Sequence, residues 1–296
     1  MLFHILFFTI MSTAASNNNR IALNDGNSIP VVGLGVYQSG PGQETYSAVL
    51  TALQNGYRHI DSAALYKNEA DVGRAVKDSG VPRDEIFITT KLWAMGGARG
   101  EQRAYDYAIS SAEQSLSRLG TYADLYLIHS PHGGPAVRME YWRAMEDLKA
   151  KGLVKSIGVS NYGVHHLKEL FESPALRVPP AVNQVEIHPF LRRDDITGYC
   201  ESKGVVVEAY SPLAKARRLD HPAVVRTAAE VERTPAQVLI RWGMQKGYVV
   251  LPKSVTAERI VSNAKVFDFE LNKSQMSALD GLDAQMCTGW NPTTLI

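Results

Sequence analysis

Four side chains with complementary chemistry stand at or just after successive apolar runs of the sequence. They are a carboxylate, a phenol, an amine and an imidazole: Asp61, Tyr66, Lys91 and His129. A phenol has a pKa of about 10, and a neighbouring ammonium group lowers it by favouring the phenolate. We therefore expect Lys91 to lower the pKa of Tyr66, Asp61 to be the counter-ion of Lys91, and His129 to orient a carbonyl oxygen. The set predicts a general acid beside a reducible carbonyl group.

Each of these residues, taken alone, also fits an ordinary structural role. Tyrosines often pack, lysines are usually solvated, aspartates often cap turns, and a histidine can be satisfied at the edge of a barrel. Their joint occurrence at the ends of successive apolar runs favours the functional interpretation.

Carbonyl reduction also needs a hydride donor, and residues 251–259 are typical of a phosphate-binding segment. Lys253 follows the last apolar run, Ser254 and Thr256 lie at a predicted helix start, and Arg259 is in its first turn. Free N–H groups at a helix start attract phosphate. Two cations beside them suit a phosphomonoester, which predicts NADPH rather than NADH; ordinary capping with solvated charges is the alternative.

The nicotinamide end of such a cofactor also has candidate partners. Tyr210 follows another apolar run and offers a flat face to a nicotinamide ring. Amide and hydroxyl groups for its carboxamide come from Ser160, Asn161 and Gln184.

These side chains need a scaffold that brings strand ends together, and the sequence alternates short apolar runs with helical patterns. Eight runs read as strands: 31–34, 58–60, 86–89, 125–128, 156–159, 182–187, 205–209 and 248–251. Helical spacing covers 45–54, 104–119, 141–150, 164–173 and 235–246, with another helix starting near 256. Such alternation predicts a parallel sheet covered on both faces.

Eight strand–helix units predict one (β/α)8 TIM barrel over residues 20–296, ending in a short C-terminal tail. Residues 20–30 read as a β-hairpin around an Asp-Gly turn. A doubly wound sheet is the alternative. In a barrel, the catalytic residues lie at the C-terminal ends of the strands, where all the candidates above fall.

Composition narrows the classes of partner. The 296 residues carry a formal charge of +1, with 45% hydrophobic and 21% charged residues, so no overall field attracts nucleic acid or a membrane. Two cysteines form no disulfide framework, and no metal site is expected. We expect a cytoplasmic monomer or weak dimer acting on a small carbonyl compound.

Residues 1–19 are predicted to be a flexible extension, with Met11 as an alternative start. The apolar run at 2–11 is too short to span a bilayer, and no positive charge precedes it. A secreted protein, with residues 1–16 as a signal peptide, is the alternative.

Two motif matches carry little weight. The segment 33–38 begins like a dinucleotide fingerprint, but Gln38 occupies the third glycine position. The Tyr199 and Lys203 pair has the spacing used by short-chain dehydrogenases, but it lacks their glycine-rich turn.

The motifs, taken in order, closely resemble the aldo-keto reductase family from about residue 20 to 283. They are Gly-Tyr-Arg-His-Ile-Asp at 56–61, Tyr-Lys-Asn-Glu at 66–69, Thr-Lys-Leu-Trp at 90–93, Gly-Val-Ser-Asn at 158–161, Asn-Gln-Val-Glu at 183–186, Ala-Tyr-Ser-Pro-Leu at 209–213 and Leu-Pro-Lys-Ser-Val-Thr at 251–256. The resemblance implies a barrel closed at its base by a hairpin, and Tyr66 as the proton donor.

The resemblance also implies the remaining cofactor contacts. Ser211 and Leu213 would contact the pyrophosphate, and Asn263 would approach the adenine. Lys253, Ser254 and Arg259 would hold the 2′-phosphate. Val36, Val255 and Thr256 complete the implied NADPH site.

Departures from the family pattern concern specificity. Tyr37 and Ser130 stand where tryptophan is common, and Ser262 replaces a frequent glutamate. Short loops after His129 and Pro212 predict an open substrate pocket lined by Tyr37, Trp93 and Trp290. Small aldehydes, dicarbonyls, sugar-derived aldehydes and keto esters all remain plausible.

Two other functions stay open at this point. The barrel could be a binding module that holds cofactor without turnover. Alternatively, Lys91 could form a Schiff base in an aldolase-type barrel, although pairing with Asp61 would keep its amine protonated.

Overall fold

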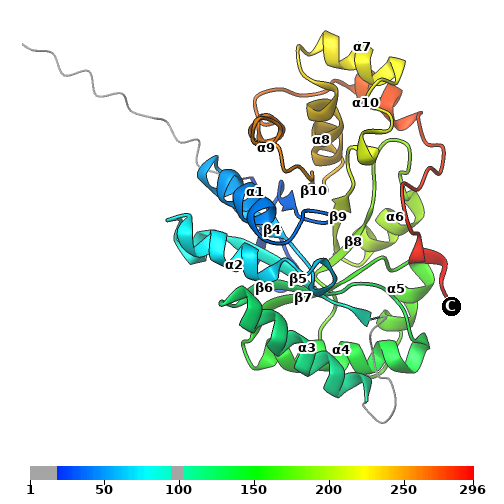
Figure 1. Ribbon diagram of the computed structural model, residues 1–296. Helices are drawn as coiled ribbons and strands as arrows, with labels where there is room; N and C mark the ends of the chain where they lie inside the picture. Colours follow the sequence, from blue (N-terminus) through cyan, green and yellow to red (C-terminus); the bar gives the residue numbers. More distant parts are fainter. Residues whose placement is uncertain (1–18, 95–102) are drawn as a thin grey trace, which may run out of the picture.

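A ring of eight parallel strands forms the centre of the computed structural model, which describes residues 19–94 and 103–296 (Figure 1). Neighbouring strands pair in chain order. They are β3 (Leu34–Gly35), β4 (His59–Asp61), β5 (Phe87–Leu92), β6 (Ala123–Ile128), β7 (Val154–Ser160), β8 (Val182–Glu186), β9 (Val206–Tyr210) and β10 (Val249–Leu251). The predicted barrel is confirmed.

The ring closes where its first and last strands meet. Isolated parallel bridges join Val32 to Val250 and Gly35 to Lys253. The Gly33 N–H donates to the Val250 carbonyl oxygen at 3.0 Å. A side chain at Gly33 would not fit here, because its Cβ would lie 2.7 Å from Nδ1 of His59 and 2.8 Å from Cδ2 of Leu251.

The hairpin of β1 (Arg20–Ala22) and β2 (Ser28–Pro30) covers the end of the barrel opposite the strand C-termini. Asn24 donates to the Pro180 carbonyl oxygen, which lies just before β8, at 2.9 Å. Leu23 and Ile29 pack with Phe87, Leu125, Leu127 and other buried residues inside that end. The predicted hairpin therefore closes the base of the barrel, opposite the C-terminal ends of its strands.

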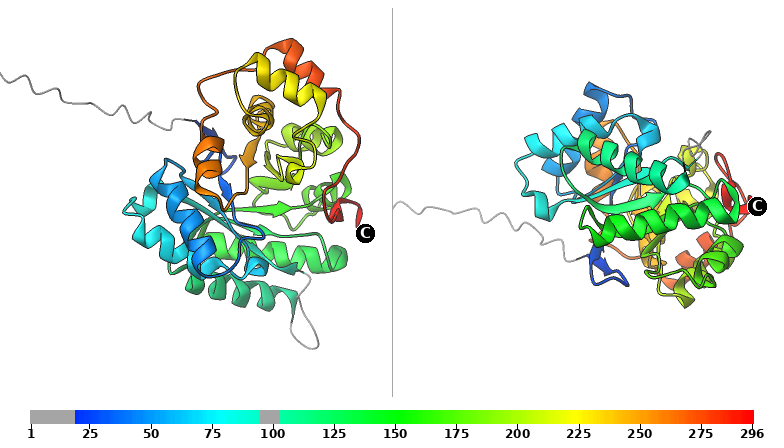
Figure 2. Two further views of the ribbon diagram at one scale, coloured as in Figure 1. Left: turned by 45° about the horizontal axis from the view of Figure 1, so that its top comes forward. Right: turned by 90° about the horizontal axis from the view of Figure 1, so that it is seen from below.

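The helices surround the ring and bury the outer faces of its strands (Figures 1 and 2). They are α1 (Gln43–Gln54), α2 (Glu69–Asp78), α3 (Ala104–Leu119), α4 (Gly134–Ala150), α5 (Val164–Phe171), α6 (Asp194–Ser202), α7 (Pro222–Glu230), α8 (Pro235–Gln245), α9 (Ala257–Ala264) and α10 (Lys273–Asp280), with short 3-10 turns η1 (Ala64–Tyr66), η2 (Arg83–Glu85), η4 (Ala214–Ala216) and η5 (Pro292–Thr294).

Several predicted boundaries need correction. The helix expected from Tyr141 begins at Gly134, with Pro135 in its first turn, so most of the supposed loop after His129 is helical. A proline at this position fits because its missing N–H would be unpaired anyway. The third strand runs on to Leu92 through polar residues, because every side chain of β5 is buried.

The C-terminal segment, red in Figures 1 and 2, runs past the open end of the barrel and finishes beside α5. Glu186 accepts hydrogen bonds from both the backbone and the hydroxyl of Thr288. The Leu295 carbonyl oxygen lies 2.7 Å from Nε2 of His166. These contacts fix the tail over the site described below.

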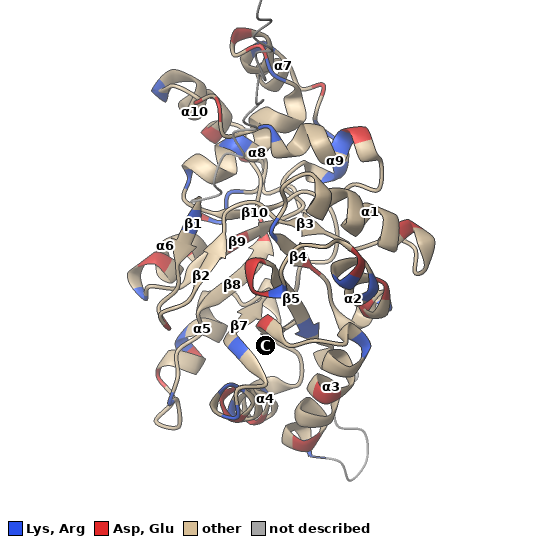
Figure 3. Ribbon diagram, turned by 90° about the vertical axis from the view of Figure 1, so that its left-hand side faces the viewer, with Lys and Arg blue, Asp and Glu red and all other residues tan. Residues whose placement is uncertain are grey.

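Charged residues of both signs are mixed along the outer helices (Figure 3). No helix within 19–94 and 103–296 is both long and apolar enough to cross a bilayer. The N-terminal extension and the signal-peptide alternative fall on residues 1–18, outside the described part of the chain.

Candidate active site

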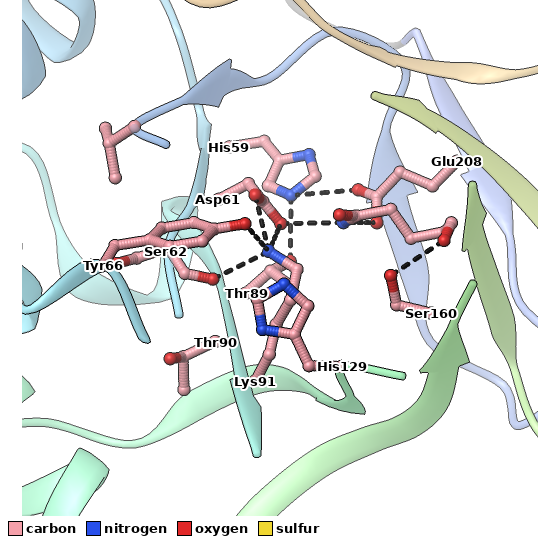
Figure 4. Close-up of polar contacts among 12 residues, drawn as sticks. His59, Asp61, Ser62, Tyr66, Thr89, Thr90, Lys91, His129, Ser160 and Glu208 are labelled. Atoms are coloured by element: carbon pink, nitrogen blue, oxygen red, sulfur yellow. Dashed lines mark hydrogen bonds and ion pairs between the residues drawn. The ribbon is translucent and has the colours of Figure 1, made fainter. Parts of the chain in front are cut away.

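Lys91 is the centre of a buried hydrogen-bond cluster at the open end of the barrel (Figure 4). Its Nζ donates to Oδ1 and Oδ2 of Asp61 at 2.7 and 2.8 Å, and to the Ser62 carbonyl oxygen at 2.8 Å. The lysine is fully buried, and Asp61 is 3% exposed. The predicted ion pair is present, and the carbonyl oxygen of Ser62 completes it.

The Tyr66 hydroxyl lies 3.4 Å from Lys91 Nζ. Lys67, the residue after η1, adopts a left-handed backbone with φ 57°, and this turn places the phenol above the ends of β4 and β5. Burial raises the pKa of Tyr66 well above its usual value, and the negative charge of Asp61 adds to that rise. The lowering of the Tyr66 pKa that we predicted is therefore wrong for the free protein, in which Tyr66 holds its proton at neutral pH.

His129 follows β6 and turns its ring toward Tyr66. The two ring centroids are 5.6 Å apart, with planes at 78°. Burial, and secondly the charge of Lys91, hold the pKa of His129 well below its usual value. The imidazole is therefore neutral, with one N–H that can donate to an oxygen near Tyr66.

The four residues expected at the nicotinamide end form one hydrogen-bonded chain. Tyr210 donates to Oδ1 of Asn161 at 2.9 Å, and the Ser160 hydroxyl donates to the Gln184 carbonyl oxygen at 2.8 Å. Asn161 donates to the His129 carbonyl oxygen at 3.0 Å from a left-handed backbone with φ 63°. These bonds thereby link Tyr210 to His129.

The Gln184 side chain has a further role that the sequence did not suggest. Its Nε2 donates to Oδ2 of Asp61 at 2.8 Å and to Oε2 of Glu208 at 2.6 Å. Both amide hydrogens are thus used by carboxyl groups. Within the described part of the chain its oxygen has no hydrogen-bond donor, so the oxygen is the group left for a ligand.

The segment predicted to bind phosphate lies between β10 and α9, next to the closing seam of the barrel. Lys253 and Arg259 are exposed, and neither has an ion-pair partner among the described residues. Thr256, the N-cap of α9, makes no side-chain cap; instead its N–H donates to the Ser254 hydroxyl at 3.1 Å. Unpaired cations beside an uncapped helix start fit a phosphate group.

The other predicted cofactor residues follow β3 and β9 or lie at and on α9. Val36 is buried after β3, Ser211 and Leu213 are half-buried after β9, Val255 is exposed before α9, and Asn263 is buried on α9. Ser211 has a left-handed backbone with φ 50°.

Aromatic side chains line the approach to Tyr66, as predicted. The Tyr37 ring is 47% exposed and lies 5.0 Å from the Tyr66 ring. Trp93 lies 5.3 Å from His129 and 6.5 Å from Trp290, which the C-terminal tail supplies. His132, not singled out from the sequence, stacks on Trp290 with ring centroids 5.1 Å apart. Aromatic rings therefore lie next to both Tyr66 and His129.

A protonated phenol, a buried lysine–aspartate pair and a neutral histidine lie together at the mouth of a (β/α)8 barrel. The Aldo/keto reductase family model matches residues 31–284, and the chain belongs to that family.

Three known proteins are similar to this chain over most of its length. The chain is 42% identical over 282 residues to glyoxal reductase of Bacillus subtilis, covering 95% of this chain and 99% of the relative. It is 43% identical over 293 residues to glycerol 2-dehydrogenase (NADP(+)) of Saccharomyces cerevisiae, covering 88% and 91% of the two chains. The crystal structure of MGS-M4, an aldo-keto reductase from a Medee basin deep-sea metagenome library, superposes with a TM-score of 0.86 at 39% identity, covering 94% of this chain and 99% of that one.

Proposed function

We propose that the protein reduces aldehydes or ketones to alcohols with NADPH, and that Tyr66 donates the proton. The observation that carries the proposal is the contact of the Tyr66 hydroxyl with Lys91 Nζ, which is itself held by both oxygens of Asp61. NADPH, when bound, would supply the hydride from its nicotinamide ring.

Each residue of the cluster has one part in the proton transfer. His129 donates a hydrogen bond to the carbonyl oxygen and orients it. Tyr66 gives its proton to that oxygen as negative charge develops there. Lys91 stabilises the resulting phenolate, and Asp61 keeps the lysine charged and in place. Solvent then returns a proton to Tyr66.

The cofactor assignment is supported by the charges beside α9. Lys253, Arg259 and the helix start would hold the 2′-phosphate, which distinguishes NADPH from NADH. Tyr210 would stack on the nicotinamide, and the free oxygen of Gln184 would accept from its carboxamide. The NADP(+) in the name of the yeast relative agrees with this choice.

The aromatic side chains near Tyr66 support a class of substrate. Tyr37, Trp93 and Trp290 offer aromatic faces beside Tyr66 and His129, and Tyr37 and Trp290 are each 47% exposed, which suits small aldehydes and dicarbonyls. The name of the Bacillus relative, a glyoxal reductase, points to the same chemistry.

The Schiff-base alternative is disfavoured by the state of Lys91. A nucleophilic amine must lose its proton, but this one donates to three oxygens of Asp61 and Ser62 and is fully buried. An ion-paired ammonium is a poor nucleophile.

The test follows NADPH absorbance with methylglyoxal and 4-nitrobenzaldehyde as substrates. Tyr66→Phe should lower kcat by at least about 100-fold and leave the Kd for NADPH unchanged. Tyr46→Phe is the matched control, because that hydroxyl donates to Asp78 at 3.1 Å on the outside of the barrel. Wild-type turnover in Tyr66→Phe would refute the proton-donor role, and tight NADPH binding without turnover of any carbonyl would favour the binding module.

We further propose that the protein is cytoplasmic and monomeric. Cys200 and Cys287 are both free, as a reducing compartment would allow. Light scattering after size-exclusion chromatography tests the oligomeric state, and a stable dimer would contradict it.

A further inference from the structure

A second carboxyl group lies beside the ion pair of the active site (Figure 4). Glu208 of β9 is fully buried. Its Oε2 accepts from the Gln184 Nε2 that also donates to Asp61, at 2.6 and 2.8 Å. One amide therefore bridges the two acids, so a change at Glu208 is transmitted to the counter-ion of Lys91.

The other oxygen of Glu208 has no hydrogen-bond partner within the described residues. It faces Nε2 of His59 at 3.5 Å, and burial lowers the pKa of that histidine to about 3. His59 is therefore neutral at ordinary pH and brings no positive charge. A buried ionised carboxylate with one unpaired oxygen is costly, and protonation removes most of that cost.

The charges around Glu208 lead to the same conclusion. β4 contributes Asp61 and the neutral His59, and β5 contributes Lys91. The residues paired with Glu208 on β8 and β10 are Gln184 and Val249, neither of them charged. Two ionised acids against one ammonium would leave this buried cluster with a net negative charge, whereas a protonated Glu208 balances it. Burial, and secondly the charge of Asp61, raise the pKa of Glu208 to about 8.

We infer that Glu208 is a positioning residue that carries a proton at neutral pH and, through Gln184 and Asp61, sets the negative charge that Tyr66 faces during proton transfer. The inference rests on the proposed function. When Glu208 loses its proton, the added charge raises the pKa of Tyr66 further and destabilises its phenolate. Carbonyl reduction should therefore slow as pH rises through about 8.

The kinetic test compares pH profiles of kcat for carbonyl reduction. Glu208→Gln keeps the shape of the side chain and an acceptor for Gln184, but it has no proton to lose. The descending limb near pH 8 should move up by at least about one pH unit in this variant. Glu270→Gln is the control, because that glutamate is exposed and pairs with Arg241 at 3.1 Å; its profile should match the wild type. Superimposable profiles for Glu208→Gln and wild type would overturn the inference.

An infrared titration tests whether Glu208 carries a proton, and it does not depend on enzymatic turnover. The wild-type protein should show the C=O stretching band of a buried protonated acid at neutral pH, and the band should vanish above about pH 8. Glu208→Gln should lack it, and Glu270→Gln should keep it. Absence of the band from the wild type at neutral pH would overturn the inference even if Glu208→Gln failed to fold. A wild type that shows the band but reduces no carbonyl would refute the proposed function and leave the proton on Glu208 assigned.

Discussion

Replacing Lys91 by methionine removes one charge from the active site and keeps a long unbranched side chain in its place. In the native protein the ammonium binds both oxygens of Asp61 and lies 3.4 Å from the Tyr66 hydroxyl. The substitution therefore has two separable effects. The phenolate loses its stabilising cation, and a buried carboxylate loses its partner.

The catalytic effect follows from Coulomb's law. At 3.4 Å and an effective dielectric constant of about 20, a full unit charge on the phenolate gains about 5 kcal/mol from the ammonium. A transition state with about half of that charge gains about 2.5 kcal/mol. Because each 1.36 kcal/mol changes a rate tenfold, kcat should fall by about 70-fold, and by up to about 4,000-fold if the full charge develops in the transition state.

The loss of stability can be reversed by a second substitution. Leaving Asp61 buried without its partner should cost about 3–5 kcal/mol of unfolding free energy. The double variant Lys91→Met with Asp61→Asn removes the orphaned charge, so it should recover much of that stability while its kcat stays low.

Urea unfolding and NADPH-coupled turnover on the same three proteins separate the two effects. The reasoning would be refuted if Lys91→Met kept a wild-type kcat, or if the double variant regained turnover together with stability. Recovery of stability alone would show that the cation acts on Tyr66 directly.

Three further outcomes are expected. Lys253→Met with Arg259→Met should raise the KM for NADPH by at least about 100-fold and leave the KM for NADH unchanged, because each of the two charge-assisted contacts contributes about 1.5–3 kcal/mol. Equal effects on both cofactors would exclude a 2′-phosphate site. Burial lowers the pKa of His59 to about 3, so as pH falls below about 6.5 this histidine takes up a proton only in the unfolded chain. The free energy of unfolding should therefore fall by up to about 1.4 kcal/mol per pH unit because of this group. The urea midpoint of His59→Gln should lack this contribution to the pH dependence. Trp290→Ala should lower kcat/KM for 4-nitrobenzaldehyde by about tenfold more than for methylglyoxal, and an equal loss on both would remove Trp290 from the substrate approach.

Much of the barrel was predictable from the sequence, because the spacing of apolar residues indicates which face of a helix or strand is buried. The predicted helix at 104–119 matches α3 from end to end, since its apolar spacing is uninterrupted. The predicted strand that precedes Lys91 stopped at Thr89, because Thr90 and Lys91 look like the start of a loop, although both are buried and β5 runs on to Leu92. Buried strands are usually recognised as apolar runs. A strand that contributes polar side chains to a buried cluster inside the barrel does not show this pattern.

The sequence predicted which residues meet in the candidate site, but it did not predict all of their pKa shifts. Asp61, Lys91 and Tyr66 meet as expected, but spacing contains no measure of desolvation, and burial reverses the expected direction of the Tyr66 pKa shift. Glu208 and His59 were missed. A signal for Glu208 existed, because it is an acid inside the apolar run 205–209, but the bridge through Gln184 depends on which strands become neighbours.

The closing seam between β3 and β10 has a consequence for the way this chain is made. Its two strands come from opposite ends of the barrel sequence, so a chain emerging from the ribosome holds Asp61, Tyr66 and Lys91 long before Lys253 is translated. Until β10 arrives, β3 and β9 present unpaired backbone edges that can pair with other chains, and closure between such distant segments is slow. Premature termination just before β10 should therefore yield an aggregating fragment that contains every proton-transfer residue and still lacks a closed barrel to hold them.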